Sequence, residues 1–107
     1  MKTDLTYEEF KKYEIEIPAE WKNSFKMFGE SYDHRFKFEN GYGASVIKHY
    51  GSYGYQEDEF ELAVLKFDED GTESLCYNTP ITDNVIGWLT NDEVLETLNK
   101  IKNLEVN

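Results

Sequence analysis

The fold class of this chain is decided by the stretch Glu59-Phe60-Glu61-Leu62-Ala63-Val64-Leu65-Lys66-Phe67. Successive side chains of a strand point to opposite faces of a sheet, and apolar residues here occupy both sets of alternate positions. Both faces of such a strand are therefore at least partly covered. This pattern predicts a central strand over residues 59–67 in an antiparallel sheet.

Strand and turn signals lie on both sides of this stretch. Residues 35–39 alternate between polar and apolar, Asn40-Gly41 is a strong hairpin signal, and residues 44–50 can return as a second strand. After the central strand, Asp68-Glu69-Asp70-Gly71 predicts a turn that leads into a short strand at 74–77. We therefore expect a small antiparallel sheet of three to five strands.

The clearest helix signal is at the C-terminal end. Thr90-Asn91-Asp92-Glu93 fits a capping box, in which the threonine hydroxyl and the glutamate carboxylate each accept a backbone N–H. Apolar residues then recur at helical spacing, so we predict a helix over 91–104 that packs on the sheet and buries Leu98 and Ile101. Ile86 and Trp88, just before it, are expected to be buried against this helix.

The N-terminal third is predicted to contain helical segments. Thr6-Tyr7-Glu8-Glu9 fits a second capping box, followed by a short helix to about Tyr13. Pro18 suits the first turn of another helix, which Gly29 ends. Residues 14–17 alternate and can instead form a short strand. The chain is thus expected to be one α+β domain, residues 1–107, with N-terminal helical segments and a C-terminal helix on the sheet.

Acidic residues dominate the charge of the 107 residues, with 22 Asp and Glu against 11 Lys and Arg and a formal net charge of −11. Residues 57–73 alone hold eight acids and one base, for −7. This charge disfavours direct binding to nucleic acid and to anionic membranes. It favours a basic protein partner. The alternative interpretation is that the acidity only keeps the protein soluble.

No apolar run is long enough to span a bilayer, and residues 1–6 do not look like a secretory signal. Cys76 is the only cysteine, so no disulfide can form within the chain, and we expect a cytoplasmic protein. Cys76 with His34 or His49 could in principle make a nucleophile and base, but Cys76 is predicted to be strand packing.

The acidic turn at 68–71 is not predicted to bind calcium. If its residues are aligned with an EF-hand loop, the first and last ligand positions fall on Lys66 and Tyr77, which cannot supply the missing carboxylates. We therefore expect no catalytic residue, no metal site and no cofactor.

The best candidate for a partner-binding site is the aromatic and acidic segment around the start of the central strand. Tyrosines alternate there with glycine and serine, which suits an adaptable interface, although they could simply pack on the sheet. Acidic residues follow at once, and a second acidic group lies in the turn at the other end of the strand. The predicted partner-binding residues are Tyr53, Tyr55, Glu57, Asp58, Glu59, Glu61, Asp68, Glu69 and Asp70.

Four stretches resemble small uncharacterised acidic proteins that bacteriophages and prophages encode. They are Asn40-Gly41-Tyr42-Gly43-Ala44-Ser45-Val46-Ile47, Gly51-Ser52-Tyr53-Gly54, Phe60-Glu61-Leu62-Ala63-Val64-Leu65 and Asn78-Thr79-Pro80-Ile81-Thr82-Asp83-Asn84-Val85-Ile86-Gly87-Trp88-Leu89. The resemblance implies an inhibitor in the host cytoplasm, similar to anti-restriction and anti-CRISPR proteins, whose carboxylates act as a DNA mimic. It carries over no catalytic residue.

These observations lead to one leading hypothesis and two alternatives. The leading hypothesis is a protein-binding domain without catalysis, an inhibitor of a host nucleic-acid-binding defence protein that acts through its acidic surface. The first alternative is a phage structural or assembly accessory protein. The second is a small ligand-binding domain or enzyme, which a cleft containing His34 or His49 beside a carboxylate would favour.

Overall fold

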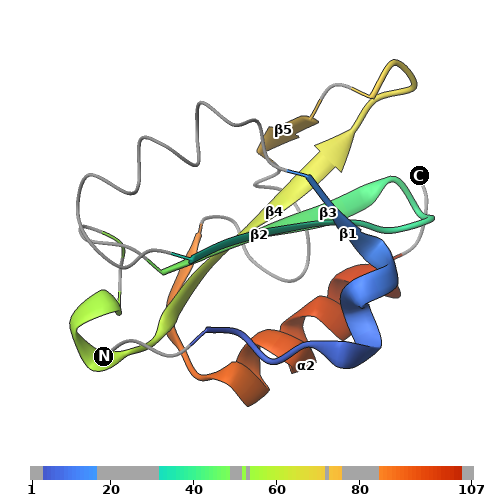
Figure 1. Ribbon diagram of the computed structural model, residues 1–107. Coiled ribbons are helices and arrows are strands. Elements are labelled where there is room, and N and C mark those ends of the chain that lie inside the picture. Colours follow the sequence, from blue (N-terminus) through green and yellow to red (C-terminus); the bar gives the residue numbers. More distant parts are fainter. Residues whose placement is uncertain are drawn as a thin grey trace.

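The centre of the computed structural model is β4 (Phe60–Phe67), the strand expected over 59–67 (Figure 1). β3 (Tyr42–Lys48) pairs with one side of it. β5 (Glu73–Leu75) and β6 (Ile86–Leu89) pair with different parts of its other side. The structure describes residues 4–16, 32–48, 52, 54–71, 73–75 and 85–104.

Two further strands complete the sheet. β2 (Tyr32–Lys37) pairs with β3, and β1 (Glu14–Ile15) pairs with β2. All pairs are antiparallel, in the order β1-β2-β3-β4-β5, and β6 shares the fifth position with β5. The predicted antiparallel sheet and the central place of β4 are confirmed.

The hairpin between β2 and β3 turns at Asn40-Gly41, as its sequence predicts. Gly41 has a φ of +86°, a conformation that a glycine adopts without strain. The Asn40 side chain also donates from Nδ2 to the carbonyl oxygens of Ile101, Lys102 and Leu104, at 2.9, 3.1 and 3.0 Å. The turn therefore satisfies carbonyls that the end of the C-terminal helix leaves without intrahelical partners.

The C-terminal helix α2 (Asn91–Lys102) begins at the predicted capping box. The Thr90 hydroxyl accepts the Glu93 N–H, and the Glu93 carboxylate accepts the Thr90 N–H, which holds the pKa of Glu93 below its usual value. The helix lies below the sheet in Figure 1, and its apolar stripe is part of the core that it shares with the sheet. Leu98 and Ile101 are fully buried, so the predicted packing is confirmed.

The N-terminal segment differs from its prediction at the start of its helix. The 3-10 helix η1 (Glu8–Tyr13) follows Tyr7 without any side-chain cap, so the expected Thr6–Glu9 capping box is wrong. The Thr6 backbone is instead engaged from another element, because its N–H donates to Asn91 Oδ1 and its carbonyl accepts from Asn91 Nδ2. Within the alternating residues 14–17, Glu14 and Ile15 form the short strand β1. The helix expected from Pro18 to Gly29 lies outside the described residues.

One apolar core lies between the sheet, α2 and the N-terminal segment. The segment contributes Leu5 and Phe10, and both are almost completely buried. Ile86 packs half-buried against this core, but Trp88 is 55% exposed, so its expected burial is wrong. Trp88 lies in the irregularly paired strand β6 with a φ of +56°, a backbone state that no sequence pattern at this position predicts.

Candidate functional site

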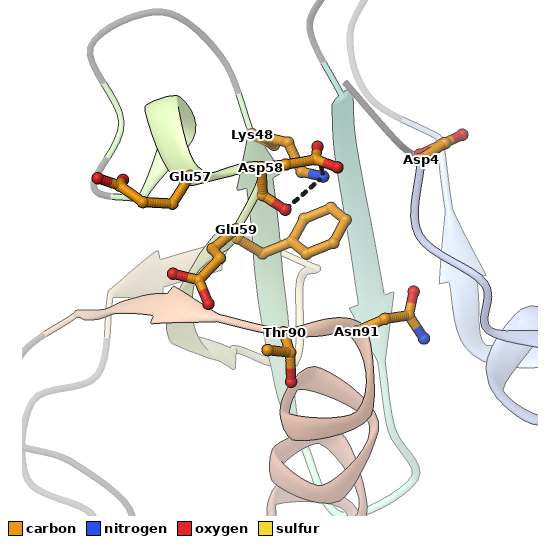
Figure 2. A pocket seen from close by; sticks show the side chains of 8 residues that line it. Asp4, Lys48, Glu57, Asp58, Glu59, Thr90 and Asn91 are labelled. Carbon is orange, nitrogen blue, oxygen red and sulfur yellow. Dashed lines mark hydrogen bonds and ion pairs between the residues drawn. The ribbon is translucent and has the colours of Figure 1, made fainter. Parts of the chain in front are cut away.

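An ion pair between a buried lysine and a partly exposed aspartate lies at the start of β4. Lys48 ends β3 with its side chain 1% exposed, and its ammonium lies 2.7 Å from Asp58 Oδ1 and 3.1 Å from the Asp58 carbonyl oxygen (Figure 2). The ammonium also lies 3.9 Å from the ring centroid of Phe60. A buried charge is stable only with such partners. One predicted partner-binding carboxylate is therefore already bound by the chain's own lysine.

The loop before β4 is built around Gly54. Its carbonyl oxygen accepts the N–H groups of Glu57 and Glu59, at 3.1 and 2.9 Å, across the short 3-10 helix η2 (Tyr55–Glu57). Asp58 has a φ of +60°, which costs a non-glycine residue about 1–2 kcal/mol. The ion pair with Lys48 offsets this strain and, with the hydrogen bonds to Gly54, stabilises this conformation of the loop.

This loop forms one wall of a pocket with a volume of about 310 Å³. Four carboxylates and one ammonium line it, for a formal charge of −3, and the N-terminus of α2 closes one side. Figure 2 shows the Glu57 carboxylate pointing away from Lys48, toward which Asp58 points. The lining residues are Asp4, Lys48, Glu57, Asp58, Glu59, Phe60, Thr90 and Asn91.

Trp88 lies beside the same loop. A Cβ placed on Gly54 would be 3.0 Å from both the N and the Cα of Trp88, and 3.2 Å from the Cβ of Glu59. Gly54 is thus packed against the Trp88 backbone of β6 and the Cβ of Glu59, so the backbone of the exposed Trp88 borders the acidic loop. The sequence analysis did not single out Trp88 or Lys48. No sequence pattern indicates the left-handed backbone of Trp88, and none indicates that a lysine at the end of a strand is buried.

The structure separates the other predicted acidic residues from this pocket. Glu61 pairs with Ile47 and follows the buried Phe60, so its half-buried side chain belongs to the opposite face of β4. Asp68, Glu69 and Asp70 are exposed at the far end of β4 (Figure 1). There the Gly71 N–H donates to the Asp68 carbonyl oxygen, which closes the predicted turn.

The predicted tyrosine anchors are not tested. Tyr53 lies outside the described residues, and Tyr55 belongs to η2 but its side chain is not described. Cys76 and His49 also lie outside the described residues, so their assignment to packing stays a prediction. Among the residues that the structure describes, no group of three or more His, Cys, Asp or Glu side chains could hold a metal ion.

His34 contacts two carboxylates but does not line the pocket. It lies in β2 with 8% of its surface exposed, and its two ring nitrogens face Asp4 and Glu14. The Tyr7 hydroxyl donates to the other oxygen of Glu14. Burial, together with this hydrogen bond and the charge of Glu14, raises the pKa of Tyr7, so the phenol keeps its proton.

Comparisons with known proteins add no relative. No protein-family model matches the chain, and neither the curated proteins nor the solved structures contain a match. Within residues 4–16, 32–48, 54–71 and 85–104, no helix is long and apolar enough to cross a membrane.

Proposed function

We propose that this chain is a protein-binding domain without catalysis, and that it receives a basic partner on the acid–tryptophan surface formed by Glu57, Glu59 and Trp88. The observation that carries the proposal is the exposed Trp88 packed through Gly54 against the acidic loop. A large aromatic side chain beside carboxylates is a suitable receptor for a lysine or arginine side chain.

Charge and strain support the same surface. Glu57 and Glu59 form no ion pair with any described residue, in contrast to Asp58. Asp58 in this loop and Trp88, whose backbone packs on Gly54 of the same loop, both have a left-handed backbone. Such strain persists only where surrounding contacts enforce it, and it is concentrated at functional sites. Glu57 and Glu59 also line the pocket, and its formal charge of −3 would attract a cation to this surface.

We further propose that the basic partner is a protein that itself binds nucleic acid. A protein that normally holds nucleic acid presents the Lys and Arg side chains that this surface suits, so the chain would inhibit it by occupying the phosphate sites. The resemblance to phage-encoded proteins supports this form of the proposal. Asp68, Glu69 and Asp70 would supply a second, weaker contact at the far end of β4.

The test uses a fluorescently labelled arginine-rich peptide and measures its affinity by anisotropy in 0.15 M salt. W88A should weaken binding about tenfold, because a cation–π contact is lost, and E57K/E59K should weaken it by more than that. The matched control is E69K/D70K, which makes the same change in charge at the other end of β4. Equal losses from the two double variants would show that only net charge attracts the peptide.

A second candidate function, a small ligand-binding domain, is supported by the pocket itself. Its volume of about 310 Å³ is at the lower end of the range for small-molecule sites, and Phe60 gives it an aromatic wall. The same anisotropy assay separates the two functions. A small organic cation that displaces the peptide only from the wild type, and not from a Phe60→Ala variant that remains folded, would favour this candidate.

A further inference from the structure

The two ring nitrogens of His34 each face a carboxylate from the N-terminal segment. Nε2 lies 2.6 Å from Asp4 Oδ1, and Nδ1 lies 3.1 Å from Glu14 Oε2. A neutral imidazole carries one N–H, whereas an imidazolium carries two. Only the protonated ring can donate to both carboxylates at once, because a neutral ring turns one lone pair toward an anion.

The two carboxylates lie at the two ends of one segment. Asp4 precedes η1, Glu14 begins β1, and His34 contacts both from β2. The segment between them is anchored independently by the buried side chains of Leu5 and Phe10. The loss of one hydrogen bond does not displace two buried apolar side chains, so any opening is confined to the residues around Asp4.

The surroundings decide which contact a neutral His34 keeps. The Glu14 side chain is 31% exposed and is fixed by the Tyr7 hydroxyl, whereas the Asp4 side chain is 51% exposed. The Tyr7 ring also packs on the imidazole, with their centroids 4.9 Å apart. The remaining proton therefore stays on Nδ1, facing Glu14, and the contact with Asp4 is the one that breaks.

Among the described residues, four charged groups from other elements line the pocket together with Asp4, namely Lys48, Glu57, Asp58 and Glu59, whereas apolar residues lie beside His34 on the sheet. Its cross-strand partner on β3 is Val46, and the next residue of that row on β4 is Leu62. Lys48 lies two residues from Val46 on the same face of β3, and it is bound by Asp58. A change in the protonation of His34 therefore acts mainly on its contacts with Asp4, Glu14 and Tyr7.

We propose that His34 is a proton-operated clasp for the start of the N-terminal segment. With two ring protons it holds both Asp4 and Glu14, and with one proton it releases Asp4. Asp4 Oδ1 also accepts the Leu5 N–H, and Asp4 lines the pocket, so release changes both the local backbone and one wall of the pocket. The clasp does not depend on the proposed binding of a basic partner.

The experiment follows the ring nitrogens of His34 by NMR across a pH series, in the full chain carrying H49Q so that His34 is the only histidine. We expect both nitrogens to be protonated at low pH and only Nδ1 at high pH. In the same pH step, hydrogen exchange of the Leu5 amide, corrected for its intrinsic pH dependence, should become about tenfold faster or more.

Two variants decide whether Asp4 carries this step. D4N should abolish the pH step in Leu5 exchange, because an amide oxygen lacks the charge that depends on the imidazolium. E8Q removes a carboxylate from the same segment at an exposed position and should leave the step unchanged. The proposal is overturned if Leu5 exchange does not follow the titration of His34, if the step persists in D4N, or if the remaining proton is on Nε2.

Discussion

The two ends of β4 carry equal acidic clusters in very different surroundings. Glu57, Asp58 and Glu59 precede the strand, and residues 68–70 follow it. At the first end a buried lysine binds the loop, and a glycine packs it against β6. At the second end three exposed acids occupy a plain hairpin turn. Equal charge therefore does not mean equal structure, and the proposed recognition surface lies at the end where a lysine and a packed glycine contact the loop.

The largest expected effect is on stability, from removing Lys48. K48A should lower the free energy of unfolding by about 2–4 kcal/mol, mainly because it removes a buried side chain; the lost ion pair adds little, since the Asp58 carboxylate is 37% exposed. Urea denaturation measures this loss. K66A serves as the control at the other end of the sheet, where Lys66 is half-buried over the Tyr42 ring, and should cost about 1 kcal/mol. A smaller loss for K48A than for K66A would contradict the account of the first end.

A pair of glycine substitutions sharpens the comparison further. Gly54 and Gly71 both have positive φ values, +92° and +87°, so an alanine at either position is strained by about 1–2 kcal/mol. A Cβ on Gly54 would also press on the Trp88 backbone, whereas a Cβ on Gly71 meets no atom within 4 Å. In thermal unfolding G54A should thus be the more destabilised variant, by about 1–2 kcal/mol relative to G71A. Equal losses would mean that the contact of Gly54 with β6 is absent.

The smallest expected effect on stability concerns Trp88. W88G relieves a left-handed backbone but removes the half of the side chain that is packed, so the free energy of unfolding should change by less than about 1 kcal/mol. Peptide binding should nevertheless fall at least as far as in W88A. A loss of more than about 2 kcal/mol in stability would instead make Trp88 a structural residue.

The sequence predicts the parts of this molecule that follow from local patterns. Apolar residues at both sets of alternate positions predict β4, Asn40-Gly41 predicts the hairpin between β2 and β3, and Thr90 with Glu93 predicts the start of α2, because each signal lies in neighbouring residues. The failures all involve contacts between distant segments. The Thr6–Glu9 pair looks like a cap, but Asn91, 85 residues away, engages Thr6 instead.

The candidate site was only partly predictable for the same reason. The sequence shows the acidic residues at 57–59. It does not show that Lys48 binds the Asp58 carboxylate and leaves Glu57 and Glu59 to the proposed surface. The exposure of Trp88 depends on the irregular pairing of β6 and on a positive φ, and local hydrophobicity predicts the opposite. Tertiary context decided both features.

The most direct test of the central claim is an NMR titration of the wild-type chain with an unlabelled hexa-arginine peptide in 0.15 M salt. Backbone amide shifts of every assigned residue would be followed, together with the indole N–H of Trp88. The account predicts that the largest shifts fall on residues 54–59 and on Trp88, with smaller shifts at residues 68–70. Equal shifts at both ends of β4, or shifts confined to 68–70, would contradict it.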